Sequence, residues 1–171
     1  MSENCVPYSR KRLYLLLTIP MIVMYVAIAA FLWQASLVFF VIYLSLFVIV
    51  AISQGYVCVY WQCPYIGKFA PCVGGFCLPS SQIARLFKNV TVTERAYNII
   101  VTVALASFLC IIVIPVYFLY QQGILYLLTY LGVVLIYAVS FLWLICPVCG
   151  TRHVCPGGQT STKLREMIAG E

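Results

Sequence analysis

The chain has 171 residues, of which 64% are hydrophobic and only 8% are charged, and its mean hydropathy is +1.05. Ordinary globular domains carry about a quarter charged residues, so this composition excludes a water-soluble domain and indicates that lipid is the main solvent. The formal net charge is +6 at pH 7. In so apolar a chain we interpret this excess as a signal of membrane topology, and we expect a lipid bilayer rather than nucleic acid as the partner.

Four runs without a charged residue follow one another along the chain. Each is long enough to cross about 30 Å of hydrocarbon as a helix, at roughly 20 residues per crossing. The sequence therefore predicts an all-α membrane protein with four transmembrane helices, arranged as two tandem helical hairpins. The predicted spans cover residues 13–33, 35–57, 99–120 and 124–145.

The basic residues indicate the orientation of these spans. All ten Lys and Arg residues precede the first span, lie between the second and third, or follow the fourth, and the four acidic residues share that side. The opposite side has only the uncharged turns around Gln34 and at Gln121, Gln122 and Gly123. By the positive-inside rule, both termini and the long central loop are expected in the cytoplasm, which makes this a protein of the cytoplasmic or inner membrane.

An internal repeat organises the chain into residues 1–97 and 98–171. A displacement of 87 positions brings Gln34 onto Gln121, Tyr43 onto Tyr130 and Ser53 onto Ser140. Each half is expected to contain a hairpin, a cysteine-rich cytoplasmic turn and a short amphipathic helix at the membrane surface.

Serine and threonine residues are expected to cap the helices outside the first hairpin. Ser80 and Ser81 are predicted to begin the first short helix and Ser161 the second, because serine is favoured at helix N-caps. Thr91 and Glu94 are predicted to form a capping box before the third span.

Seven of the nine cysteines cluster where the second and fourth spans end. Closely spaced cysteines among Gly and Pro suit a metal, because the turns let thiolates converge on one point. The loop offers four thiolates and the tail three plus the only histidine, so the ligands could form one site in each half, two mixed sites, or a single region. Such donors fit zinc or an iron–sulfur cluster. The predicted metal ligands are Cys58, Cys63, Cys72, Cys77, Cys146, Cys149, Cys155 and His153.

Other roles for the cysteines stay open. Structural disulfides suit an oxidising compartment, whereas the expected topology places the clusters in a reducing one. Cys146 and Cys149 form a Cys-x-x-Cys pair that could act as a membrane thiol–disulfide oxidoreductase, although helical quinone-coupled thiol oxidases face the opposite side. Cys5 and Cys110 are interpreted as small apolar residues.

The predicted spans contain no Asp, Glu, Lys, Arg or His. Ion pumps and most transporters place such residues within the membrane, so an autonomous transport function is not expected. A single histidine also excludes a bis-histidine haem built from this chain alone. No catalytic residue is predicted, and the chain is expected to be an accessory or electron-transfer subunit.

The repeated hairpin followed by Cys-x(n)-Cys-Pro resembles the membrane ferredoxin-type proteins that serve quinol oxidation in nitrate and nitrous-oxide respiration. The residues carrying the resemblance are Cys58, Cys63-Pro64, Cys149 and Cys155-Pro156. Three residues separate the cysteines in that family, whereas four and five do here, and the separate soluble ferredoxin module is absent. The resemblance covers roughly half the chain and implies electron transfer between quinone-level carriers and a cytoplasmic metal centre.

The sequence thus favours a membrane subunit that binds an iron–sulfur centre and transfers electrons to or from quinone or a larger redox complex. The alternative is a non-catalytic membrane scaffold or assembly subunit whose cysteines hold structural zinc. Either function implies other membrane or redox subunits as partners.

Overall fold

The computed structural model describes residues 9–67, 69, 72, 77–87, 89–150, 152–153 and 155–169, and these residues form helices and turns without a β-strand. Six α-helices account for most of them, and a π-helical turn and a 3₁₀ turn follow the fifth. The elements are α1 (Lys11–Ala35), α2 (Leu37–Tyr60), α3 (Cys77–Leu86), α4 (Glu94–Gln122), α5 (Ile124–Ser140), η2 (Phe141–Ile145), η3 (Cys146–Val148) and α6 (Pro156–Ala169).

Four helical segments are long and apolar enough to cross a membrane, which confirms the four predicted spans and identifies an integral membrane protein. They extend further than the uncharged runs, because α1 begins at Lys11 and α4 at Glu94. Long side chains at a helix end reach the aqueous interface while their backbone stays helical. An uncharged run is therefore shorter than the helix that contains it. One boundary prediction was wrong: Ala35 ends α1 instead of beginning the second span.

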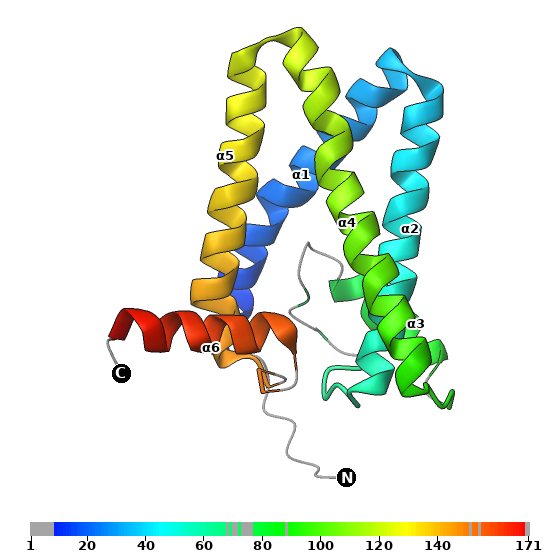
Figure 1. Cartoon of the computed structure of the whole chain (residues 1–171), viewed down its shortest axis with the longest axis vertical. Helices are drawn as coiled ribbons and strands as arrows, with labels where there is room; N and C mark the ends of the chain where they lie inside the picture. Colours follow the sequence, from blue (N-terminus) through cyan, green and yellow to red (C-terminus); the bar gives the residue numbers. More distant parts are fainter. Residues whose placement is uncertain are drawn as a thin grey trace.

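Very short connections join the spans in pairs. Only Ser36 separates α1 from α2, and only Gly123 separates α4 from α5, with a φ of 139° that favours glycine. Figure 1 shows both connections at one end of the molecule, with α3 and α6 at the other end.

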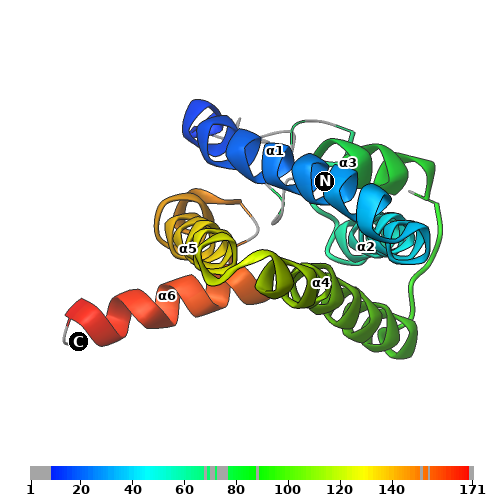
Figure 2. The same ribbon diagram turned by 90° about the horizontal axis from the view of Figure 1, so that it is seen from above.

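The two pairs of spans pack side by side in a reciprocal way. The second helix of the first pair, α2, packs against α4, while the first helix of that pair, α1, packs against α5 and η2. Figure 2 shows the molecule from above, with α2 beside α4 and α6 extending away below α5. Both helices of each pair therefore contact the other pair.

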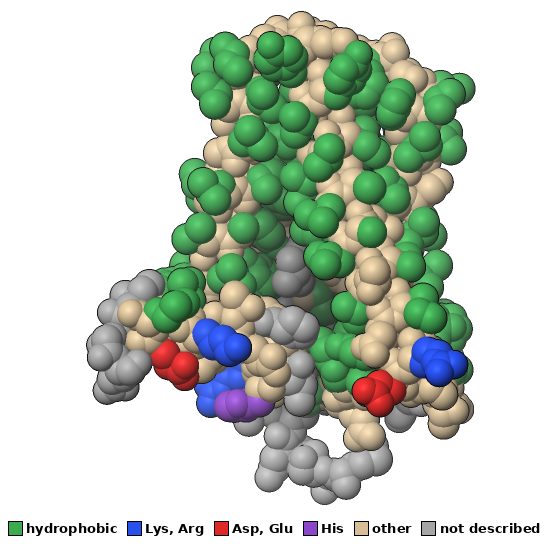
Figure 3. All heavy atoms as spheres, viewed as in Figure 1, with side chains coloured by type: hydrophobic (Ala, Val, Ile, Leu, Met, Phe, Trp, Pro, Cys, Tyr) green, Lys and Arg blue, Asp and Glu red, His purple; other side chains and the backbone are tan. Residues whose placement is uncertain are grey.

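The surface of the spans suits a lipid environment. Large apolar side chains such as Leu16, Val38, Leu105 and Ile136 are exposed along all four helices. Figure 3 shows this apolar surface over most of the visible face, whereas the charged side chains gather at the end that carries α6. The buried core between the helices is unusually rich in aromatic hydroxyls, and it contains Tyr14, Tyr25, Tyr43, Tyr130 and Tyr137.

The predicted helix caps were wrong, and the serines have another role. Helix α3 begins at Cys77 and α6 at Pro156, so Ser80, Ser81 and Ser161 lie within helices instead of before them. All three are buried. Ser81 donates to the carbonyl of Tyr65 at 3.2 Å, Ser161 donates to the carbonyl of Leu142 at 2.7 Å, and Ser80 donates to Oε1 of Gln54 at 3.2 Å. The serines therefore attach the short helices to the spans.

The start of α4 also differs from the predicted capping box. Thr93 is the N-cap and accepts a hydrogen bond from the backbone amide of Ala96 at 3.4 Å. Thr91 and Glu94 do not form the cap, because Glu94 is itself the first residue of the helix. The threonine adjacent to the helix is the one that satisfies an unpaired amide.

Candidate metal centre

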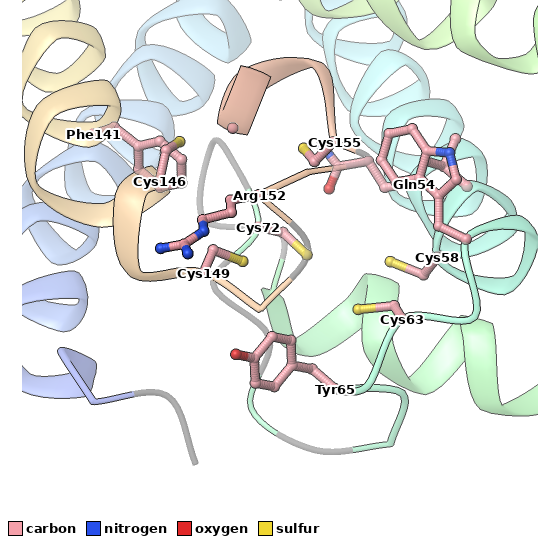
Figure 4. Close-up of a pocket in the computed structure, with 13 residues that line it drawn as sticks. Gln54, Cys58, Cys63, Tyr65, Cys72, Phe141, Cys146, Cys149, Arg152 and Cys155 are labelled. Carbon is pink, nitrogen blue, oxygen red and sulfur yellow. The ribbon is translucent and has the colours of Figure 1, made fainter. Parts of the chain in front are cut away.

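One cavity of about 190 Å³ lies at the end of the molecule where α2, η3 and α6 meet. Cysteines from both halves of the chain line it, together with apolar and aromatic side chains and one arginine. Figure 4 shows their sulfur atoms around the open centre of the cavity. The lining residues used below are Cys58, Cys63, Cys72, Cys146, Cys149, Cys155, Val57, Tyr65, Phe141 and Arg152.

The end of α2 positions the first cysteines. Cys58 lies in the last turn of the helix, and the chain then reverses at Gln62, whose φ of 48° is in the left-handed region. This reversal brings the backbone amide of Cys63 to 2.9 Å from the carbonyl of Cys58, to which it donates. Cys58 and Cys63 thereby face the same cavity although four residues separate them.

Cys72 is held from the side by the first transmembrane helix. The hydroxyl of Tyr14, which is fully buried, donates to the carbonyl of Cys72 at 2.9 Å. The ring of Tyr14 also packs edge-on against Phe69 at 5.2 Å between centroids. A residue near the start of α1 therefore fixes the position of a cysteine nearly sixty residues later.

The second half supplies its cysteines from a series of tight turns. Helix α5 passes into the π-helical turn η2, and Cys146 then begins the 3₁₀ turn η3. The amide of Cys149 donates to the carbonyl of Cys146 at 3.2 Å, and the amide of Arg152 donates to the carbonyl of Cys149 at 3.2 Å. Cys155 stands immediately before α6. Single-turn π-helices occur often at functional sites, and this one ends at Ile145, directly before Cys146.

Tyr65 connects the two halves at the cavity. Its hydroxyl accepts a hydrogen bond from the backbone amide of Gly150 at 3.2 Å, and its own carbonyl accepts from Ser81. The Tyr65 side chain is buried, and Gly150 leaves room for it: a Cβ at Gly150 would lie 3.1 Å from the hydroxyl oxygen. The cysteine turn after α2 and the cysteine turn after η2 are thus joined directly.

The thiols on the α2 side interact with one another. Side-chain hydrogen bonds link Cys58 with both Cys63 and Cys72. The hydrogen bond to Cys58 raises the pKa of Cys63 well above the usual range of a thiol, and burial of Cys63 raises that pKa further. Without a bound cation, the Cys63 thiol is therefore protonated at neutral pH.

Arg152 is the charged side chain of the cavity lining. Its Nη1 donates to the carbonyl of Pro147 at 3.0 Å and its Nε donates to Nε2 of His153 at 3.1 Å. Arg152 is exposed, so its positive charge lies at the solvent-facing rim of the cavity.

Comparisons with protein-family models, curated proteins and solved structures found no match.

The structure brings six of the eight predicted ligands to this one cavity: Cys58, Cys63, Cys72, Cys146, Cys149 and Cys155. His153 is exposed, does not line the cavity, and accepts a hydrogen bond from Arg152. Cys77 begins α3, but the position of its side chain lies outside the described part of the structure. The gathering of cysteines from both halves agrees with the single-region arrangement among the alternatives that spacing left open.

The other cysteine predictions have different outcomes. Cys110 is exposed on α4, within a span, and Cys5 lies outside the described residues. The seven cysteines whose side chains the structure describes are in the thiol form. Within the described residues, no three His, Cys, Asp or Glu side chains are close enough together to hold a single metal ion.

Residues outside the cysteine clusters also shape the cavity, and spacing alone did not identify them. Tyr14, Tyr65 and Ser161 position the cysteine turns through hydrogen bonds to the backbone. A second sequence alignment could have identified part of this framework. Displacement by 83 positions superimposes Cys63-Pro64 on Cys146-Pro147, Gly67 on Gly150, and Cys72 on Cys155.

Proposed function

We propose that this protein is an integral membrane electron-transfer subunit whose two halves together hold one iron–sulfur cluster. The observation that carries the proposal is the convergence of six cysteines, three from each half, on a single cavity. Cysteine thiolates are the usual ligands of such clusters. Other apolar residues line the rest of the cavity wall. Apolar packing by small side chains therefore does not by itself require six cysteines there.

The size of the cavity favours a polynuclear group over a single ion. A cavity needs a volume of only about 10–15 Å³ to hold one water molecule, whereas the volume of this cavity is about 190 Å³. Four thiolates bound tetrahedrally to one zinc ion at about 2.3 Å must lie about 3.8 Å apart. Cys58, Cys63 and Cys72 come from the first half and Cys146, Cys149 and Cys155 from the second, and all six line the same cavity. A cluster of two or four iron atoms can take four thiolates from both sets.

The surroundings suit a buried anionic redox centre. A bound cluster supplies one-electron transfer, and its potential depends on the charges and the solvent around it. Val57 and Phe141 line the cavity with apolar surface. Neutral thiols such as Cys63 would release their protons on binding iron.

The partners proposed for electron exchange are a membrane quinone or a neighbouring redox subunit. The exposed apolar surface of the four spans gives direct access to the bilayer, where quinones dissolve. The cavity lies near the ends of α2 and η2, so an electron carrier in the membrane or at its surface could approach the cluster closely.

We also propose that the cysteine-lined end faces the cytoplasm, because the charged residues gather there. A fluorescent protein that matures only in the cytoplasm, fused after Glu171, is expected to fluoresce in intact cells. An alkaline phosphatase fused at the same place is expected to be inactive, since it requires export. The reverse pair of results would place the cavity on the outer side.

Anaerobic purification with iron, zinc and sulfide analysis tests the metal. We expect brown protein with broad visible absorption and equal amounts of iron and acid-labile sulfide. Colourless protein with stoichiometric zinc would contradict the proposal and indicate the scaffold function. Metal-free protein with a Cys146–Cys149 disulfide that exchanges with added thiols would instead indicate an oxidoreductase.

A further inference from the structure

The two cysteine-rich segments are copies of one longer motif. Both read Cys-Pro-x-x-Gly-x4-Cys-x-Gly-Gly, from Cys63 in the first half and from Cys146 in the second. The motif places Cys63 equivalent to Cys146 and Cys72 equivalent to Cys155. Six fixed positions within a segment of thirteen residues are far more specific than a match between apolar helices, so we treat these cysteines as products of duplication.

The packing of the helices relates the two halves in the same way. α2 packs against α4, and its counterpart α5 packs against α1, the counterpart of α4. The connectivity is that of a two-fold relation between the halves, although α2 and α4 contact each other far more extensively than α1 and α5 do. Each half crosses the membrane twice and so enters in the same direction, which places the axis of this relation along the membrane normal.

The attachment of the short helices repeats as well. Ser81 and Arg85 of α3 resemble Ser161 and Arg165 of α6 in type and spacing, at a displacement of 80 positions instead of the 83 of the cysteine motif. Ser81 and Ser161 are both buried, and each donates to a backbone carbonyl close to the first cysteine of its motif. A buried serine therefore supports the chain near each cysteine motif, with its acceptor two residues after Cys63 in the first half and four residues before Cys146 in the second.

We propose that the occupant of the cavity is held by the four duplicated cysteines, Cys63, Cys72, Cys146 and Cys155, two from each half. In the view of Figure 4, Cys63 and Cys146 lie on opposite sides of the cavity, with Cys72 and Cys155 between them. This inference rests on the proposed function and assigns its ligands. A four-cysteine set completes the ligation of one cluster.

The glycine after the second cysteine supports this assignment. A Cβ at Gly157 would lie 3.7 Å from Sγ of Cys146 and 3.9 Å from Sγ of Cys155. Two sulfurs of the proposed set thus flank the same point, and a glycine there leaves space beside both. The motif has the equivalent glycine two residues after Cys72.

The two remaining cysteines of the cavity have no duplicated counterpart. The two halves align at a displacement of 87 positions up to Ser53 and at 83 positions from Cys63 onward, so the first half has four extra residues between these points. Cys58 lies in this longer stretch. The position equivalent to Cys149 is Ile66. Both line the cavity, and we assign them to the surroundings of the cluster instead of its ligand set.

Single replacements by alanine, which cannot ligate iron, test this assignment. The six variants are C63A, C72A, C146A, C155A, C58A and C149A, each purified anaerobically in detergent. Iron, acid-labile sulfide and visible absorption are measured per chain, and gel filtration with helical circular dichroism reports folding. We expect each of the first four variants to lose most of its iron while remaining folded, and C58A and C149A each to retain more iron than any of those four.

The outcomes separate this inference from the proposed function. Wild-type protein that contains no iron would overturn both. A second result would overturn only the ligand assignment. In it, the wild-type protein contains iron, C58A or C149A loses the cluster, and a folded variant of the first four retains it. If one of the four variants fails to fold, the remaining three and the two controls still decide the result.

Discussion

Replacing Gly158 by alanine is expected to remove most of the bound iron while leaving the four spans in the membrane. A Cβ at this position would collide with the Cα, carbonyl carbon and carbonyl oxygen of Arg152. These are backbone atoms of the turn between Cys149 and Cys155, so the clash cannot be relieved by rotating a side chain. The turn must move, and a misplacement of Cys155 disrupts the ligand set. Iron and sulfide per chain are the measurement.

Gly132 provides the matched control for this substitution. It lies within α5, and a Cβ there would meet no atom within 4 Å. Gly132→Ala is therefore expected to retain the wild-type iron content, and Gly158→Ala is expected to remain helical and monodisperse. A Gly158→Ala protein with unchanged iron would show that the start of α6 does not determine the position of the ligands.

Replacing Gly55 by alanine is expected to destabilise the fold by roughly 1–3 kcal/mol, the usual cost of overpacking a close contact. A Cβ on Gly55 would lie 2.6 Å from Cγ2 of Ile83 and 3.3 Å from the backbone nitrogen of Ala84. α3 would have to separate from α2, which weakens the hydrogen bond between Ser80 and Gln54. Denaturation in mixed detergent micelles, followed by circular dichroism, measures the change.

The same Gly132→Ala variant controls for the intrinsic effect of alanine in a helix. Alanine is favoured over glycine by roughly 0.5–1 kcal/mol in helices, so Gly132→Ala should match or exceed the wild-type stability. Equal stability of Gly55→Ala and Gly132→Ala would contradict the close packing of α3 on α2. The Gly55 variant should also lose iron more readily on dilution, since Ser81 of α3 supports the Tyr65 turn.

The four spans could be predicted from the sequence because the bilayer imposes a strong condition. A crossing segment must be long, helical and nearly free of charge, and such runs can be recognised without knowledge of tertiary contacts. Their ends were less predictable, since Lys11 and Glu94 are part of the helices. The hydropathy of a residue indicates its solvent but does not locate the last hydrogen bond of a helix.

The short helices show where local patterns failed. Ser80, Ser81 and Ser161 have the composition of caps, but burial against the spans gives their hydroxyls backbone and side-chain acceptors elsewhere. Tertiary contacts therefore determined where α3 and α6 begin. The hydroxyl of a buried serine can form a hydrogen bond with a neighbouring segment just as the hydroxyl of an N-cap serine does with its own helix. The sequence alone does not distinguish the two positions.

The cysteines were predicted as ligands by residue type and spacing, whereas their common cavity depends on how the two halves pack. Linear spacing could not choose between one site in each half and a shared site. The contacts between α2 and α4, and the hydrogen bond from Gly150 to Tyr65, bring the two cysteine turns together. His153 is near these cysteines in sequence, but its turn directs it to the surface, where it accepts a hydrogen bond from Arg152.

Native mass spectrometry of the anaerobically purified protein, released from detergent, tests the shared iron–sulfur centre most directly. We expect one dominant species whose mass exceeds that of the 171-residue chain by the mass of one iron–sulfur cluster. A second scan after denaturation should show the mass of the reduced chain alone. A dominant species carrying two separate metal ions or two clusters, or no metal at all, would contradict a single centre held by both halves.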